Sequence, residues 1–209
     1  MWRRRERKNY FLFWSWQTLG EFFVMTALVI DTSSIRTIVG LVSQQREIFS
    51  KFHEGATAHA EALPLLVNEA LAIENTIEKV IIGMGPGPFT GLRVGITFAQ
   101  SFAVARKIPW VGVCSLDGIN IESDKYIIAT DARRKELYWA RYENQRRAEG
   151  PNVAKPDEVS NISGMKYGFS FGEPLYPNVK GLFAAASSVD VREPIYLRKP
   201  DAQPTSERR

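Results

Sequence analysis

The sequence predicts an α/β fold built from two similar halves, and three observations predict it. Short apolar strands alternate with segments of helical periodicity, which is typical of helices that cover a sheet. A strand that ends in aspartate, followed by a polar turn and a second strand, occurs at Asp31 and again at Asp131. This recurrence after about 100 residues indicates a duplicated unit. The second copy has fewer recognisable elements, so we expect it to be abbreviated.

The composition describes a globular protein with a substantial core. The chain has 209 residues, of which 44% are hydrophobic and 24% are charged. Its single cysteine, Cys114, excludes an internal disulfide and fits a reducing compartment, so we expect a cytoplasmic protein. The net charge is +4, but the excess of basic residues lies in residues 1–24 and in the tail from Arg198 onward. The near-neutral remainder makes direct nucleic-acid binding a minor hypothesis.

The chain divides into four predicted parts. Residues 1–24 combine a basic opening with many aromatic residues, and polar residues interrupt them too often for a membrane helix. We interpret them as a disordered extension or a start-site artefact ahead of Met25, with a membrane-surface anchor as the alternative. Residues 25–122 then form the N-terminal half, residues 123–197 the shortened C-terminal half, and residues 198–209 a disordered tail.

The N-terminal half is predicted to start with a meander. Three strands joined by short polar connections lie at 27–30, 35–42 and 47–52. Apolar residues at helical spacing from Ala60 to Leu71 predict an amphipathic helix. Strands follow at 79–83 and 110–113, and Ser115 is predicted to cap a short helix that ends at Ile121.

The stretch from Ile81 to Ala105 organises this half. A buried strand leads into a turn rich in glycine and proline, and Thr90 is expected to be the N-cap of the following helix. No charged residue occurs from Val94 to Ala105, so we expect this helix to be covered on two sides.

Small residues recur at every fourth position of the same helix. We call them the small-residue stripe: Gly91, Gly95, Ala99 and Ala103. Because small side chains allow close approach, we predict that the stripe faces outward and receives a helix of another protein. Val94, Phe98 and Ala105 are then expected to point elsewhere, down onto the sheet.

The second half repeats the pattern in a shorter form. A strand at 126–130 ends in Asp131, a basic turn follows, and a second strand lies at 136–142. Weaker strands are expected near Val153 and at 167–171, and a helix at 179–186.

Two segments offer candidate ligand contacts, each with a structural alternative. Asp31, Thr32 and Ser33 could meet a metal–phosphate group, or form a turn that satisfies its own backbone. Gly85 and Gly87 could cradle phosphate, but the spacing is neither a dinucleotide fingerprint nor a P-loop, and two prolines remove amide donors. A structural turn is favoured there.

No catalytic or metal site emerges from the residues. His59 lacks a second histidine at helical spacing, so no metal site is predicted. Cys114 has no histidine near it in sequence and is expected to be a buried structural thiol. No pairing of a nucleophile with a base is visible.

Several segments in order together resemble one known family. They are ALVIDTSS, HAEALPLLVNEAL, GPGPFTGLRVG, IPWVGVCSLDGI, TDARRKELYWARY and EPIYLRKPDA, spread over about residues 25–200. The chain is similar to the TsaB (YeaZ) family of partner subunits in bacterial tRNA threonylcarbamoyladenosine synthesis. The resemblance implies an actin-like ATPase fold of two ribonuclease-H-like halves.

The resemblance also implies a role without catalysis. Proteins of this family bind the catalytic paralogue TsaD as a heterodimer, and with TsaE the assembly transfers a threonylcarbamoyl group to adenosine 37 of ANN-decoding tRNAs. Transfer RNA is then contacted only through the complex, and two copies of the chain could pair in isolation. No tightly bound cofactor is implied, although ATP or ADP could sit at the interface of the complex.

The resemblance implies that two helices form the partner interface. Carried over by position, the interface residues are His59, Leu63, Leu66, Val67, Ala70, Gly91, Arg93, Gly95, Ala99 and Ala103. Pro88 stands where the family usually has serine, which weakens a ligand contact through this turn.

A competing hypothesis is an enzyme of the same fold. A small ATPase or a peptidase-like protein would use Asp31 to position a metal–nucleotide. The missing phosphate loop and the missing metal-binding histidine pair argue against it.

Overall fold

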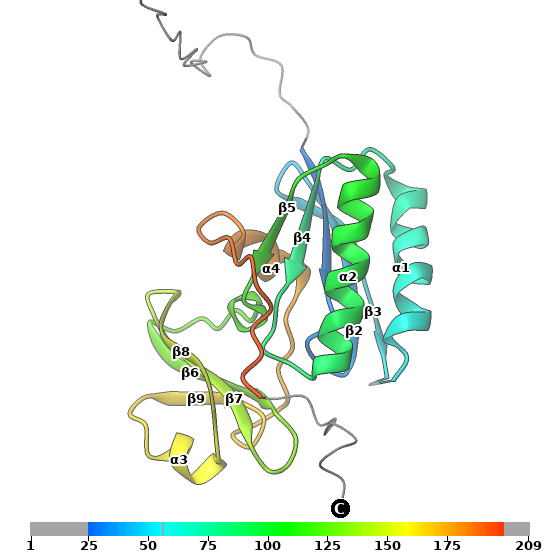
Figure 1. Ribbon diagram of the computed structural model, residues 1–209. Coiled ribbons are helices and arrows are strands. Elements are labelled where there is room, and N and C mark those ends of the chain that lie inside the picture. Colours follow the sequence, from blue (N-terminus) through cyan, green and yellow to red (C-terminus); the bar gives the residue numbers. More distant parts are fainter. Residues whose placement is uncertain (1–24, 56, 199–209) are drawn as a thin grey trace, which may run out of the picture.

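The computed structural model of the chain describes residues 25–55 and 57–198, which form two lobes (Figure 1). The predictions for residues 1–24 and 199–209 lie outside the described residues. The first lobe contains a five-stranded sheet in the order β3-β2-β1-β4-β5. Its strands are β1 (Thr26–Asp31), β2 (Arg36–Ser43), β3 (Arg46–Glu54), β4 (Lys79–Gly83) and β5 (Trp110–Val113). The predicted antiparallel meander β1–β2–β3 is confirmed.

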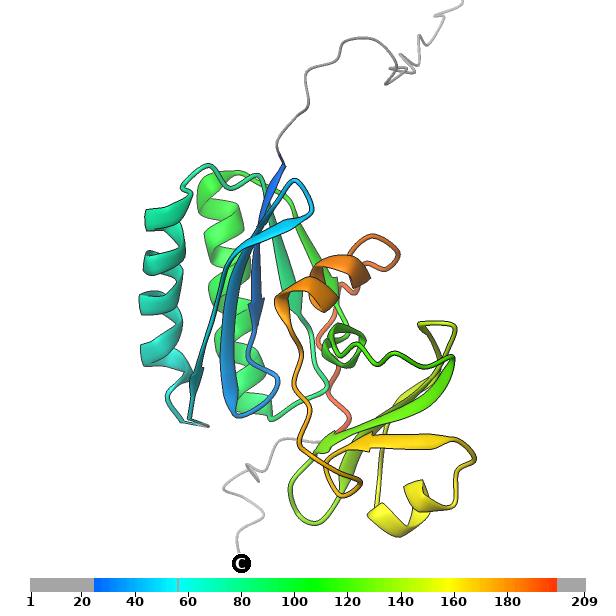
Figure 2. The same ribbon diagram turned by 180° about the vertical axis from the view of Figure 1, so that it is seen from behind.

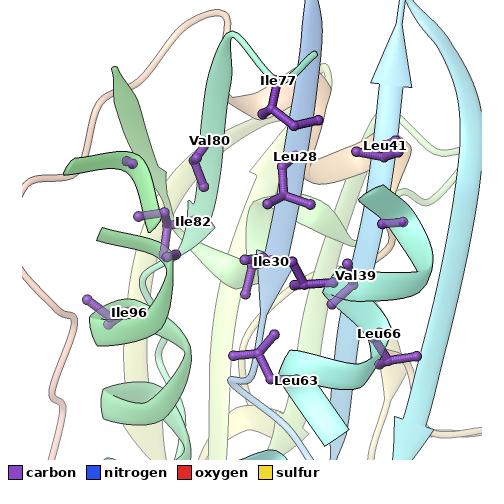
Figure 3. Close-up of a cluster of buried hydrophobic side chains, with 14 of the residues drawn as sticks. Leu28, Ile30, Val39, Leu41, Leu63, Leu66, Ile77, Val80, Ile82 and Ile96 are labelled. Carbon is purple, nitrogen blue, oxygen red and sulfur yellow. The ribbon is translucent and has the colours of Figure 1, made fainter. Parts of the chain in front are cut away.

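Two long helices cover one face of this sheet, α1 (His59–Ile73) and α2 (Phe89–Arg106) (Figure 1). Figure 3 shows the core between these helices and the sheet, where Leu63 of α1 and Ile96 of α2 meet the strand residues Ile30 and Ile82. The short helix α4 (Val179–Ala185) covers the opposite face of the sheet, which Figure 2 shows toward the viewer. Apolar burial on both faces explains why β1 is buried throughout.

The second lobe repeats the first in reduced form. Its sheet has the order β8-β7-β6-β9, with β6 (Lys125–Asp131), β7 (Leu137–Glu143), β8 (Arg146–Ala154) and β9 (Met165–Gly168). In both lobes the first strand pairs antiparallel with the second and parallel with a later one. The predicted duplication is therefore confirmed. One five-residue helix, α3 (Pro156–Ser160), belongs to this lobe.

The chain returns to the first lobe after β9, which the predicted division at residues 122–123 does not capture. Val179 and Leu182 of α4 pack on the sheet of the first lobe, and Gly40 of β2 leaves the space that Val179 fills. Beyond α4, the amide of Val191 donates to the carbonyl oxygen of Gly112 at 2.7 Å. The expected second half, 123–197, thus contributes its last segment to the first.

The 3-10 helix η1 (Ser115–Gly118) connects the lobes. Asp117 of η1 accepts hydrogen bonds from Arg147 Nε at 2.9 Å and from the Tyr142 hydroxyl at 2.8 Å, both in the second sheet. This half-buried ion pair with its tyrosine fixes the second sheet against the first lobe.

Both predicted N-caps are wrong. Helix α2 begins at Phe89 after Pro88, with no side-chain hydrogen bond to its first turn, so Thr90 lies inside the helix. Cys114 precedes η1, and the hydroxyl of Ser115 points instead to Asp31. Among the residues that the structure describes, no helix is long and apolar enough to cross a membrane.

Candidate interaction surface

The small-residue stripe faces inward, contrary to the prediction. Ala99 and Ala103 are fully buried, and a Cβ on Gly95 would lie 2.1 Å from Thr32 Oγ1. A Cβ on Gly91 would lie 2.9 Å from the Thr32 carbonyl oxygen. The stripe therefore allows α2 to approach this chain's own β1–β2 connection. It offers no surface to another protein.

The predicted contact residues of α1 are also buried. Leu63 and Ala70 are fully enclosed, and His59, Leu66 and Val67 are at most 8% exposed. They form the inner face of the amphipathic helix, where the 3.6-residue period places apolar side chains against the sheet. Of the ten residues predicted to meet a partner, only Arg93 is exposed. The residue assignments are thus corrected, while the involvement of the two helices stays a prediction.

The exposed side of α2 is formed by residues outside the stripe. Its residues Val94, Thr97, Phe98, Ser101, Val104 and Ala105 are exposed or half-buried, and we call them the α2 outer face. Val94 and Phe98, expected on the sheet, are half-buried: they pack against the core between the helices and the sheet and reach this face only in part. Val104 is 73% exposed.

This outer face contains no charge along three turns of helix. A solvent-facing helix surface usually carries charged side chains, so an uncharged one is a candidate for protein contact. Leu65 and Ile73 on the neighbouring α1 are also 67% and 61% exposed. No charged residue occurs from Val94 to Ala105, as the sequence shows, and contact of this face with a partner stays a prediction.

Asp31 lies in a closed hydrogen-bond cluster rather than at a ligand site. Its carboxylate is fully buried; Oδ1 accepts from the amide and hydroxyl of Ser33 at 2.9 and 2.7 Å. Oδ2 accepts from the Ser115 hydroxyl at 2.5 Å. Both oxygens are engaged, so Asp31 has no free lone pair directed at solvent.

The directions of the pKa shifts agree with the burial of Asp31 and His59. Burial raises the pKa of Asp31, while the hydrogen bonds from Ser115 and Ser33 and the nearby His59 oppose that shift. Burial lowers the pKa of His59, against the attraction of Asp31. His59 Nδ1 lies 2.8 Å from the Thr37 hydroxyl, which anchors the start of α1 to β2.

The glycine-rich turn is equally closed. Gly85 has φ of +95°, and a Cβ there would lie 2.9 Å from Leu92 and 3.1 Å from the carbonyl oxygen of Ile195. A Cβ on Gly87 would lie 2.2 Å from the Ser33 carbonyl oxygen. These glycines permit close packing of the turn against its own chain, as the structural interpretation predicted. Thr32 is likewise buried, and its hydroxyl donates to the Gly91 carbonyl oxygen at 2.8 Å.

A cleft opens between the lobes beside this turn. Ser33 and Ser34 line it from the first lobe, and Thr130, Asp131 and Arg133 from the second. Phe169 and Tyr176 add aromatic walls. Of the predicted phosphate-contact residues, Ser33 lines this cleft. No group of three His, Cys, Asp or Glu side chains placed to hold a metal ion occurs within residues 25–55 and 57–198.

Comparison with known proteins places the chain in a family. The model of the family described as "TsaD: tRNA N6-adenosine threonylcarbamoyltransferase" matches residues 43–203. The uncharacterized protein Rv3421c of Mycobacterium tuberculosis is 36% identical over 202 residues, covering 87% of this chain and 95% of that protein. The uncharacterized protein ML0378 of Mycobacterium leprae is 38% identical over 200 residues, covering 85% of this chain and 56% of that protein.

A named relative is more distant. The tRNA threonylcarbamoyladenosine biosynthesis protein TsaB of Escherichia coli is 29% identical over 150 residues, or 65% of this chain and 64% of that protein. The chain thus spans less than two thirds of the length of ML0378 and of this TsaB protein.

Solved structures share the fold. A Pseudomonas aeruginosa protein described as similar to peptidase YEAZ superposes with a TM-score of 0.71 at 23% identity, covering 83% of this chain and 100% of that chain. YeaZ from Pseudomonas aeruginosa gives 0.65 at 24% identity, covering 78% and 91%. The predicted actin-like fold is confirmed, and the chain belongs to the TsaB (YeaZ) branch of the TsaD family.

Proposed function

We propose that this chain is a non-catalytic subunit in the formation of threonylcarbamoyladenosine at position 37 of ANN-decoding tRNAs. In this role it binds and activates a TsaD-type transferase, with TsaE as a further component. The relatives named for tRNA threonylcarbamoyladenosine biosynthesis support the pathway. The partner-binding role rests on the α2 outer face.

The α2 outer face supports docking because of what it exposes. Val104 and the half-buried Val94 and Phe98 present apolar surface, and the exposed Thr97 and Ser101 add only short hydroxyl side chains. Such a surface can pack against another helix without burying an unpaired charge. A TsaD-type protein of the same superfamily would present an equivalent helix pair, and a second copy of this chain would occupy the surface in its absence.

The closed cluster around Asp31 supports the non-catalytic part of the proposal. An actin-like enzyme that used Asp31 would need a carboxylate oxygen directed at a metal–nucleotide, whereas Ser33 and Ser115 engage both oxygens here. We therefore expect no ATP turnover by the isolated chain. Any ATP or ADP would be bound by the assembled complex.

Reconstitution tests the proposal. Purified TsaD and TsaE from the same organism, supplied with threonylcarbamoyl-adenylate and an unmodified ANN-decoding tRNA, are assayed with and without this chain by mass spectrometry of nucleosides. We expect modified adenosine only when the chain is present. Equal product without the chain would contradict the proposed function.

A further inference from the structure

We propose that one corner of the molecule is an RNA-binding surface, so that this chain itself contacts the RNA, with an unpaired RNA loop as the ligand. The inference rests on the proposed function, because it names the second partner of the same subunit. We call the surface the basic corner. Its residues are Phe89, Arg93, Arg133, Arg134, Lys135, Tyr196 and Arg198.

The basic corner is built around the turn between β6 and β7. Arg133, Arg134 and Lys135 follow one another there, and all three are exposed. Their φ angles are +59°, +52° and +61°, in the left-handed region that residues with a Cβ rarely occupy. Hydrogen bonds between Ala132 and the Glu136 carbonyl oxygen (3.0 Å) and between Glu136 and the Arg133 carbonyl oxygen (3.0 Å) hold this conformation.

This conformation is unusual for these residue types. The β7–β8 turn uses left-handed backbone too, but there Asn144, a residue suited to it, is followed by Gln145. Glycine would fit the β6–β7 turn with less strain. Gln44 and Gln45 in the β2–β3 turn have left-handed backbone as well, so the β6–β7 turn is distinguished by its three consecutive basic side chains.

The C-terminal segment brings a fourth cation to the turn. Arg198 forms an ion pair with Glu136, and its guanidinium donates to the Arg133 carbonyl oxygen at 3.4 Å. Upstream, the amide of Ile195 donates to the Met84 carbonyl oxygen at 2.8 Å. The segment is thereby fixed between the two lobes, and Tyr196 and Arg198 are held in place.

A pair of aromatic rings, tilted at 45° to each other, lies next to these cations. The rings of Tyr196 and Phe89 are 4.9 Å apart, and the Arg93 guanidinium lies 5.3 Å from the centre of the Phe89 ring. Tyr196 is 40% exposed. Aromatic rings and arginine planes beside flexible cations are the means by which proteins hold unstacked RNA bases and their phosphates.

The basic corner carries a local excess of positive charge. Residues 25–198 contain nineteen basic and nineteen acidic side chains, so they are neutral as a whole. The basic corner has five basic residues, while the acidic residues of its turn, Asp131 and Glu136, are each engaged within it. A neutral body with one basic corner steers a polyanion to that corner.

The position also fits the proposed partner. Arg93 and Phe89 lie in the first turns of α2, whose following turns form the α2 outer face. An RNA loop at the basic corner would therefore lie beside a transferase docked on the same helix.

Charge reversal tests the inference on the full chain. We compare the double variant Arg133→Glu/Lys135→Glu with Arg146→Glu/Lys180→Glu, which changes net charge equally at exposed sites elsewhere. Binding of a fluorescent, in vitro transcribed ANN-decoding tRNA is measured by anisotropy across about 50–200 mM salt. For the corner variant we expect about tenfold weaker binding and a salt slope smaller by about 2. The control variant should bind like the unaltered chain.

Two further measurements separate the inference from its alternatives. Tyr196→Leu should weaken tRNA binding without changing the salt slope, because it removes stacking and no charge. Affinity for TsaD should be unchanged in the corner variant, so a failure of the proposed function would be visible separately. The inference is overturned if the unaltered chain does not bind tRNA, if both double variants weaken equally, or if double-stranded DNA of equal length competes as well as tRNA.

Discussion

The hydroxyl of Ser115 donates a 2.5 Å hydrogen bond to Oδ2 of Asp31, joining the start of η1 to the end of β1. Gly83 lies over this contact, where a Cβ would be 1.8 Å from the same oxygen. The Asp31 carboxylate thus ties the end of β1 to η1 inside the first lobe. Asp31 is a structural residue here.

Ser115→Ala should destabilise the protein. It removes the hydroxyl that donates to the buried Asp31 Oδ2, which costs roughly 1–3 kcal/mol. Urea unfolding followed by circular dichroism measures the change. Ser187→Ala, at an exposed serine, is the control and should stay within about 0.5 kcal/mol of the unaltered protein. Equal stabilities for the two variants would show that the Asp31 cluster contributes nothing.

His59 should make the stability pH-dependent. Burial lowers its pKa below 6.5, so the unfolded chain binds a proton at a higher pH than the folded chain. The stability that this difference contributes is present in full above pH 6.5 and is lost as the pH falls through the folded-state pKa.

The measurement is the free energy of unfolding at about pH 7.5 and about pH 5.5. The unaltered protein should lose more stability on acidification than His59→Gln does. His53→Gln, at an exposed histidine of β3, should keep most of this pH dependence, reduced somewhat because the charge of His53 helps to lower the pKa of His59. A pH dependence that survives in His59→Gln would place its origin at another group.

Gly95→Ala should damage the fold, because the new Cβ would lie 2.1 Å from Thr32 Oγ1. Overpacking of this kind costs about 1–3 kcal/mol. Ser101→Ala on the exposed side of the same helix is the matched control. The double variant Gly95→Ala/Thr32→Ala should recover part of the loss relative to the sum of the single changes. Strict additivity in thermal unfolding would rule out the close approach.

Lys135→Gly should stabilise the protein while weakening its binding to RNA. Removing the left-handed strain should stabilise the fold by about 1–2 kcal/mol. The greater flexibility of glycine in the unfolded chain should offset about 0.5–1 kcal/mol of this gain. A net gain of about 0.5–1 kcal/mol is expected in urea unfolding. Lys180→Gly within α4 should lose about 1 kcal/mol. A loss at residue 135 as well would mean that the turn is not strained.

The sequence was sufficient for most strand positions and for the antiparallel meander β1–β2–β3, because these patterns are local, whereas the parallel pairing of β1 with β4 was not predicted from it. The recurrence of a strand ending in aspartate at Asp31 and Asp131 correctly indicated the duplication. The position of α4 could not be predicted. This helix has seven residues and follows β9, and its sequence does not indicate which of the two sheets it covers. Its position depends on a tertiary fit, in which Gly40 accommodates Val179.

The predicted direction of the small-residue stripe was the main error at the candidate site. A stripe of small residues and an uncharged outer side have the same periodicity, so the sequence could not distinguish a close approach to the chain's own backbone from one to another protein. Thr32 decides it, because the β1–β2 connection passes directly over Gly91 and Gly95. The basic corner was missed because Arg93, Arg133 and Arg198 are distant in sequence and meet only in the folded chain.

The affinity of this chain for TsaD tests the central claim most directly. Isothermal titration calorimetry compares the unaltered chain with Val104→Glu, on the α2 outer face, and with Met165→Glu, an equally drastic change at a 63% exposed site of the second lobe. A carboxylate buried unpaired in the interface should cost about 2 kcal/mol or more, which is roughly a 30-fold rise in the dissociation constant. We predict that rise for Val104→Glu and none for Met165→Glu. Unchanged affinity in Val104→Glu would contradict docking on the α2 outer face.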